Sequence, residues 1–435
     1  MNNARRVKRS LKNCINEVSL KKDLYCYNPG VDFSRDRKLT FSEMLKAILC
    51  FSGKSLNKEL LEIFGCKSNI ASVSAFVQQR DKIKPSAFEE LFHQFTDSIT
   101  SNKLFLGYRL LAVDGSDFST PDFQQKSNGE ISNLYHLTAL FDLCAKVYTD
   151  AYIQKPFEKN EHKALVEMAK RTCFLHPTIF IADRGFESLN NMAHIQELGQ
   201  FFLLRFKDIN SNGIASGFDL SEFGDTFDIS FDLKMMRKQT NQTRELFKDK
   251  NHYKFIAHNT TFDFLPKRLR KSDPLDIFNL KFRLVRFELS NGNYEVIATN
   301  LNTSDFPLEK LKAIYAMRWE IETSFRGLKY ALALRNFHSK KPEGILQEIF
   351  AKLTMYNFTQ MIISQIIIVK DQRKYLYKIN FSVSVLACRR LFLGFSPPNE
   401  VEATIQRHIL PIRQEQHKPR TVKSSTCVSF SYRLA

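Results

Sequence analysis

Three acidic residues stand where a metal-dependent reaction would need them. Asp114 and Asp183 each directly follow a run of apolar residues that predicts a buried strand. Strand ends on one edge of an α/β sheet are where ligands and catalytic groups collect, and Mg²⁺ or Mn²⁺ prefers carboxylate and water oxygens as ligands. We therefore expect both carboxylates to reach the same divalent ion. The alternative is that each aspartate only caps a turn, as the nearby Gly115 and Gly185 suggest.

The third acid, Glu322, lies in a segment with helical spacing. Tyr315, Arg318, Glu322 and Lys329 are separated by three, four and seven residues, so on a helix they fall within about 60° of one another. Glu320 points to nearly the opposite side. The apolar stripe about a quarter-turn away comprises Leu311, Ile314, Met317, Ile321 and Leu328. The polar stripe should therefore reach a cleft at the margin of the buried face, unless it is a solvated ladder of ion pairs.

The segments around these acids predict an α/β core. Helical spacing marks residues 163–173 and 188–198. Apolar runs predict strands at 109–113, 135–143, 146–153, 178–182 and 201–205. Three consecutive strands followed by alternating helices and strands favour a mixed sheet flanked by helices. Residues 206–300 interrupt the alternation and end in a hairpin around Asn291 and Gly292, so we expect a β-rich insertion there.

The remaining segments are expected to be mainly helical or irregular. Residues 1–100 have helical spacing, and two short helices around Gly65 followed by a basic flank favour either a helix-turn-helix or a structural bundle. The tail beyond Pro397 should be loosely packed. The expected division is a helical N-terminal DNA-binding domain, a two-part catalytic core, the insertion and a basic C-terminal region. In the same order, these four parts are residues 1–100, residues 104–205 together with 301–370, residues 206–300 and residues 371–435.

Charge and composition limit the kinds of molecule that the protein is expected to bind. There are 64 Lys and Arg residues against 46 Asp and Glu residues, a formal charge of +18, which favours nucleic acid or an anionic membrane. The longest apolar stretch is too short and interrupted to span a bilayer, and the N-terminus lacks the apolar run of a signal peptide. The eight cysteines have no zinc-site spacing. We therefore expect a cytoplasmic protein with no membrane partner.

Three motifs in order resemble those of one enzyme family. The segment Tyr315 to Lys329 is similar, position for position, to the signature helix of the insertion-sequence transposases of the family numbered four, within the DDE superfamily. Residues 113–116 (VDGS) and 182–186 (ADRGF) resemble that family's first and second aspartate motifs. The resemblance covers roughly residues 40–370. It implies a ribonuclease-H-like core with the insertion placed before the glutamate.

The resemblance also implies a reaction. Asp114 would bridge two Mg²⁺ (or Mn²⁺) ions, with Asp183 and Glu322 each completing one, for cleavage of transposon ends and strand transfer into target DNA. Arg318 and Lys329 would bind phosphates beside the scissile bond, and Tyr315 would donate to a terminal 5′ phosphate. The implied partners are double-stranded DNA and a second copy of the chain in a synaptic homodimer. A bacterial cytoplasmic protein, associated with the nucleoid when bound to DNA, is implied too.

Other residues and functions remain open. Asp117 would replace Asp114 if the strand ended later, and His136 and Asp142 either approach the metal or pack in the core. Weaker candidates for stacking a flipped base or contacting DNA are Phe262, Phe264, Tyr294, His338 and Lys340–Lys341. A non-catalytic or domesticated DNA-binding protein would explain the charge but not the three placed acids. A ribonuclease-H-like nuclease would explain the acids but not the Tyr-Arg-Lys stripe.

Overall fold

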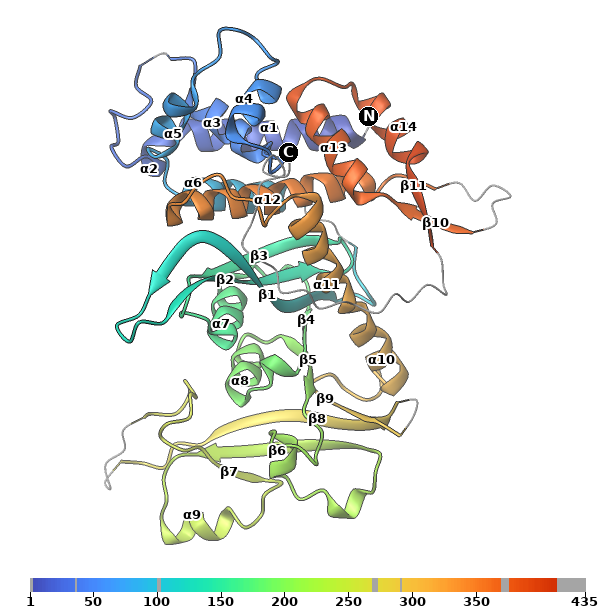
Figure 1. Cartoon of the computed structure of the whole chain (residues 1–435). Coiled ribbons are helices and arrows are strands. Elements are labelled where there is room, and N and C mark those ends of the chain that lie inside the picture. The colour runs from blue at the N-terminus through green and yellow to red at the C-terminus, as the bar shows by residue number, and fades with distance from the viewer. Residues whose placement is uncertain are drawn as a thin grey trace.

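One large mixed sheet organises the molecule. The computed structural model describes residues 3–35, 37–99, 103–267, 273–289, 292–368 and 375–412. Within these residues a nine-stranded sheet has the order β3-β2-β1-β4-β5-β9-β8-β6-β7 (Figure 1). Its strands are β1 (Arg109–Gln125), β2 (Ile131–Asp142), β3 (Val147–Gln154), β4 (Thr178–Ala182), β5 (Phe201–Phe206), β6 (Phe227–Met236), β7 (Tyr253–Phe255), β8 (Phe278–Glu288) and β9 (Tyr294–Thr299).

The first five strands form the predicted ribonuclease-H-like mixed sheet, which confirms the fold class. β2 lies antiparallel to both β1 and β3, while β4 is parallel to β1 and β5 is parallel to β4. The connections on either side of β4 carry α7 (Glu161–Arg171) and α8 (Leu189–Glu197). Every residue of β4 is buried, as expected of a central parallel strand covered on both faces. Alternate residues of β1 accordingly enter two different hydrophobic cores, one on each face of the sheet.

The β-rich segment continues the same sheet. β9 pairs antiparallel with β5, and β8, β6 and β7 follow outward (Figure 1). The β8–β9 hairpin is the one predicted around Asn291, although residue 291 itself lies outside the described residues. The short helices of this segment and of the β4–α8 connection are α9 (Asn241–Leu246) and the 3₁₀ turns Ala215–Gly217, Ser221–Phe223 and Arg184–Phe186. The core and the insertion thus share one continuous hydrogen-bonded ladder.

Helices from both ends of the chain cover one face of the sheet. The N-terminal helices are α1 (Asn3–Leu20), α2 (Lys22–Tyr25), α3 (Phe41–Leu49), α4 (Leu56–Ile63), α5 (Val73–Arg80) and α6 (Ser86–Ser98). Helix α12 (Pro342–Ile363) lies between them and the sheet (Figure 1). Because both its sides are covered, α12 is buried along almost its whole length.

The segment that carries the signature is broken where one helix was predicted. Helix α10 (Leu308–Met317) ends at Arg318, α11 (Trp319–Arg326) begins after it, and Gly327–Ala331 form a π-helical turn. The amide of Arg318 bonds the carbonyl of Tyr315 three residues back, which tightens the chain at the junction. Tyr315, Glu322 and Lys329 therefore lie on three successive helical pieces, and Arg318 lies at the junction of the first two with helical backbone angles.

The C-terminal region has more structure than its sequence predicts. Helices α13 (Phe381–Leu393) and α14 (Pro398–Arg407) pack together, and β10 (Leu376–Ile379) pairs with β11 (Ile409–Ile412). The expectation of a loose tail directly after Pro397 was therefore wrong, because Val401 and Ile405 are buried against neighbouring helices. Residues 413–435 lie outside the described part. None of the described helices is long and apolar enough to cross a membrane.

Candidate active site

The register between β1 and β4 brings the two aspartates together. Val113 of β1 is paired with Ala182 of β4 in parallel, so Asp114 and Asp183 follow the last paired residues of adjacent strands. β1 itself continues to Gln125, paired only with β2. The prediction that this strand ends before Asp114 was therefore wrong. What ends there is the pairing with β4, and that opens the sheet edge beside the aspartates.

The pKa of Asp114 is raised by its surroundings. Burial is the largest cause that raises its pKa to about 6, and the negative charges of Glu322 and Asp183 raise it further. The backbone N–H of Gly115, which donates to Oδ1 at 2.9 Å, and the positive charge of Arg318 act in the opposite direction. Asp114 therefore lacks enough nearby positive charge to offset its burial and its two acidic neighbours. A divalent ion would supply it.

Asp183 acts as a turn cap and also faces the signature residues. Its carboxylate accepts a hydrogen bond from the backbone N–H of Arg184, so the capping alternative describes part of its role. The same Oδ1 accepts from the hydroxyl of Tyr315 at 3.2 Å and lies 3.6 Å from the guanidinium of Arg205. About a third of the side chain remains exposed. Capping and ligand binding are therefore compatible at this residue.

Glu322 and Glu320 point to different surroundings. Glu322 accepts a hydrogen bond from Arg318 at 3.0 Å, and its charge raises the pKa of Asp114. Glu320 pairs with Lys146 at 3.1 Å on another side of the helix. The structure thus brings Glu322, and not Glu320, to Arg318 and near Asp114.

Arg318 lies at the centre of the acidic cluster. The residue is only 2 % exposed, and burial alone would lower its pKa. Its pKa is nevertheless raised, because Tyr315, Asp183, Glu322 and Asp114 surround it. Its guanidinium also lies over the rings of Tyr315 and Trp319. Arg318 is therefore the internal counter-ion of the three carboxylates.

Lys329 reaches the site from the π-helical turn. Its ammonium donates to the backbone carbonyl of Asp117 at 2.9 Å, three residues beyond Asp114 on β1. Burial lowers its pKa, while the charges of Asp117 and Asp114 oppose this shift. A lysine placed in this way is a mobile positive charge at the rim of the site.

The three carboxylates suit a hard divalent cation in their chemistry. Oxygen donors of this kind are those that Mg²⁺ and Mn²⁺ prefer, and the raised pKa of Asp114 reflects a charge that burial leaves uncompensated. Within the described residues, however, no three acidic, histidine or cysteine side chains are gathered closely enough to enclose an ion. Glu322 is turned to Arg318 and Asp183 to Tyr315. These two side chains would exchange a protein partner for the ion on binding it.

A second polar cluster beside Asp114 was only partly anticipated. Asp117 does not replace Asp114; its carboxylate instead bonds Nδ1 of His136, which is 2 % exposed. Glu161, from the first turn of α7, lies 3.0 Å from Nε2 of the same ring. Burial opposes protonation of His136, but the two carboxylates raise its pKa above the ordinary value. No local pattern in the sequence pointed to Glu161, because only the packing of α7 on the sheet brings it there.

Other weaker candidates lie elsewhere. Asp142 binds Arg109 and caps the turn between β2 and β3. His338 is buried between Lys54 and Glu348, away from the carboxylates. The remaining candidates are the exposed Lys340, Lys341 paired with Asp81, the buried Phe262, Phe264 packed on Phe278, and Tyr294 beneath Arg286.

Comparison with known proteins identifies a family through one family model. The family described as "Transposase DDE domain" matches residues 106–358, more than half of the chain. No curated protein matches the chain. Among solved structures, the piggyBac transposase synaptic complex with hairpin DNA, determined by cryo-electron microscopy, is similar with 10 % identity and a TM-score of 0.43. The match covers 96 % of this chain and 87 % of that one. The chain belongs to the family of proteins with a transposase DDE domain.

Proposed function

We propose that this protein is a DNA transposase of the insertion-sequence family numbered four, which cuts transposon ends and joins them to target DNA. The observation that carries the proposal is the meeting of Asp114, Asp183 and Glu322 around Arg318. The two aspartates follow adjacent parallel strands and the glutamate comes from a helix. A DNA-binding protein without catalytic activity has no need of three carboxylates around one buried arginine.

The carboxylates are proposed as the metal-binding and catalytic groups. Asp114 would be shared between two Mg²⁺ or Mn²⁺ ions, and Asp183 and Glu322 would each hold one. When bound, such ions activate water and neutralise charge on the leaving 3′ oxygen. Divalent ions are the general cofactors of DDE transposases, and the identity and number of ions here are part of the proposal.

The signature residues are proposed to bind DNA phosphates. Lys329 is partly exposed and reaches the site from its rim, which suits a phosphate beside the scissile bond. Arg318 and Tyr315 now bond Glu322 and Asp183. Once ions neutralise these acids, the guanidinium and the hydroxyl would be free to donate to phosphate oxygens, Tyr315 to the terminal 5′ phosphate.

The larger organisation follows from the same proposal. Residues 1–100 would bind DNA, 104–205 and 301–370 would form the catalytic core, and 206–300 would be the insertion, with 371–435 a basic C-terminal region. The working complex would be a homodimer on two transposon ends and a target duplex. In a bacterial cell this protein would be cytoplasmic and associated with the nucleoid when bound to DNA.

A cleavage assay tests the proposal. Purified protein with Mg²⁺ or Mn²⁺ would be given DNA carrying the ends that flank its own gene. We expect cutting at those ends by the wild type, and loss of cutting in Asp114→Ala, Asp183→Ala and Glu322→Ala. Glu320→Ala is the matched control, because it removes an acid from the same helix that pairs only with Lys146. Binding without cutting by the wild type in either metal would instead support a domesticated DNA-binding protein.

A further inference from the structure

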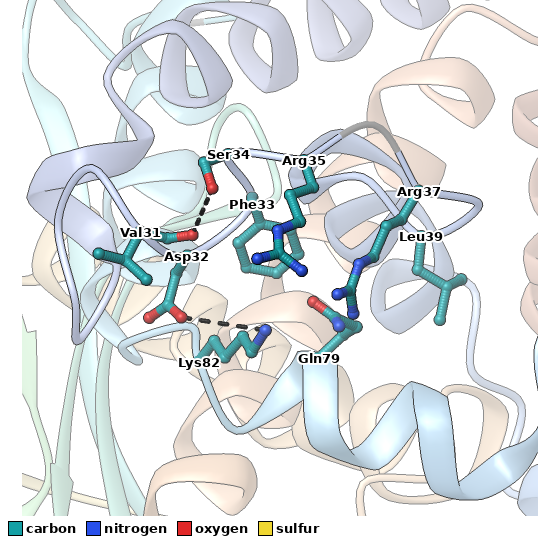
Figure 2. Close-up of a pocket in the computed structure, with 9 residues that line it drawn as sticks. All are labelled: Val31, Asp32, Phe33, Ser34, Arg35, Arg37, Leu39, Gln79 and Lys82. Carbon is teal, nitrogen blue, oxygen red and sulfur yellow. Dashed lines mark hydrogen bonds and ion pairs between the residues drawn. The ribbon is translucent and has the colours of Figure 1, made fainter.

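The N-terminal helices carry a basic pocket remote in sequence from the three acids. The loop between α2 and α3 and the end of α5 enclose a cavity of about 200 Å³. Figure 2 shows the side-chain ends of Arg35, Arg37, Gln79 and Lys82 pointing into the same space. Because Asp32 is the only acid that lines it among the described residues, three cations face one carboxylate.

The two arginines are available to a ligand. In the part of the chain that is described, neither Arg35 nor Arg37 has a hydrogen bond or ion pair with another protein group, and both are exposed. Guanidinium groups present planar pairs of N–H donors that match phosphate oxygens. Two such groups therefore offer several N–H donors to a ligand in the pocket.

The single carboxylate is already committed to the loop. Asp32 is buried, and its Oδ2 accepts hydrogen bonds from the backbone and side chain of Asn28 at 3.0 and 3.3 Å. Its other oxygen lies 4.0 Å from the ammonium of Lys82. Asp32 thus fixes the turn and orients Lys82, and no acid among the described residues pairs with either arginine.

The pocket is held in shape before any ligand binds. Phe33 has a positive φ of 56°, a rare conformation for a bulky residue, and its ring packs against Phe41. Its carbonyl accepts a hydrogen bond from Lys22 at 2.8 Å. On the other side, the backbone of Tyr27 bonds the carbonyl of Lys82 at 3.1 Å. Both halves of the pocket are therefore tied together by the protein itself.

The pocket is also tied to the catalytic part of the chain. Arg80, two residues before Lys82, is buried and bonds Gln347 and Glu348 of α12 at 2.8 and 2.9 Å. Helix α12 packs in turn on β3 of the central sheet. A ligand in the pocket would thus be held at a fixed place relative to the three acids.

We infer that this pocket binds a phosphate group of the DNA backbone, away from the scissile bond. The inference rests on the proposed function, since it takes DNA as the partner. The formal charge of +18 favours a polyanion over an isolated small anion, and a backbone contact of this kind sets the position of a duplex without reading its sequence. A free phosphate ion has the same chemistry, so the test must separate the two sources.

The test compares two double variants of the full chain, each also carrying Glu322→Gln so that DNA stays uncut. One is Arg35→Gln with Arg37→Gln. The matched control is Arg244→Gln with Arg407→Gln, two exposed arginines on α9 and α14. Affinity for a duplex of unrelated sequence would be measured by fluorescence anisotropy at several salt concentrations. All four side chains are exposed, so neither variant should disturb folding.

We expect the pocket variant to bind DNA on the order of tenfold more weakly, with a salt dependence smaller by about one unit of slope. The control should change affinity less than about twofold. Unchanged affinity in the pocket variant, or an equal loss in both variants, would overturn the inference. Thermal stabilisation by inorganic phosphate at constant ionic strength, with DNA affinity unchanged in the pocket variant, would identify a free anion instead.

The two proposals fail in different ways. If the wild type binds DNA through the pocket but never cuts it, the transposase proposal fails and the pocket stands. If the wild type cuts transposon ends while the pocket variant binds DNA normally, only the pocket inference fails.

Discussion

At the scale of single residues, the ionised form of Asp114 is unfavourable in the metal-free protein, and a bound metal ion would stabilise it. Asp114 is destabilised as an anion by burial and by its two acidic neighbours, and the buried Arg318 has all three carboxylates around it. Without an ion, Arg318 is therefore the buried counter-ion of this cluster, while Arg205 lies 3.6 Å from Asp183 beside it. Two consequences can be measured on metal-free protein.

Asp114→Asn should stabilise the metal-free protein at neutral pH. The folded-state pKa of Asp114 is about 6, above its ordinary 3.8, so the folded protein holds this proton more tightly than the unfolded chain. The stability from this residue is then present at pH 3 to 4 and is lost as pH rises towards 6. We expect a gain of about 1–2 kcal/mol above pH 6, allowing for partial exposure, and none at pH 4. Thermal unfolding in EDTA across this range checks it; an equal gain at both pH values contradicts it.

Arg318→Ala should destabilise the metal-free protein by about 3 kcal/mol at pH 7, because it leaves neighbouring carboxylates without their buried partner. Urea unfolding in EDTA measures the loss. The control is Arg326→Ala, an exposed arginine at the end of α11 that donates to the hydroxyl of Thr323 at 3.2 Å, which should cost less than about 0.5 kcal/mol. Equal effects of the two variants would mean that Arg318 has no special role as counter-ion.

At the scale of elements, β1 and α7 meet at a glycine next to Asp114. A methyl group on Gly115 would overlap the carboxylate of Glu161 and lie 2.5 Å from Nε2 of His136. That ring is buried and held from both sides by carboxylates. The absence of a side chain at Gly115 therefore lets α7 close onto the sheet next to Asp114.

Gly115→Ala should accordingly cost about 1–3 kcal/mol by overpacking and reduce DNA cleavage more than DNA binding, because the strand that carries Asp114 must shift. Gly185→Ala is the matched control. Its added methyl would meet only the Glu161 carboxylate, at an ordinary 3.8 Å, so stability should stay unchanged or rise slightly. Thermal unfolding and the cleavage assay would be run on both variants. A tolerated alanine at 115 would show that α7 and β1 can separate freely.

At the scale of the whole molecule, the N-terminal helices and the sheet share one core. The hydrophobic cluster on one sheet face includes residues of α1, α3, α6, α12 and α13. Asn357 of α12 joins the layers: its side chain bonds the backbone N–H and carbonyl of Tyr148 in β3 and the hydroxyl of Thr96 in α6, at 2.7–3.0 Å. We therefore expect the helices and the sheet to unfold as one cooperative unit.

Asn357→Leu should lower the free energy of unfolding by about 2–3 kcal/mol, since the backbone groups of Tyr148 would be buried without partners. Gln360→Ala, on the partly exposed side of the same helix, should cost less than about 1 kcal/mol. Urea unfolding followed by circular dichroism and by tyrosine fluorescence should give coincident transitions for the wild type. Separate transitions would contradict the shared core.

Local sequence patterns were enough to predict the kinds of secondary-structure element and the three acidic residues of the candidate site. Apolar runs and helical spacing are local properties of the chain, so the strands that precede Asp114 and Asp183 and the helical character around Glu322 could be predicted from them. The selection of Glu322 over Glu320 also rested on local geometry, because residues two apart on a helix face different ways.

The contacts between these residues depend on how distant segments of the chain pack together. The side-by-side placement of Asp114 and Asp183 depends on the parallel register of β1 with β4. The approach of Glu161 depends on where α7 packs, and the basic pocket joins a loop to the end of α5, some forty residues later in the sequence. The break at Arg318 and the continuation of the sheet through the insertion are likewise set by packing. Such contacts join distant parts of the chain, and no local pattern of residue types records which distant partner will be buried against them.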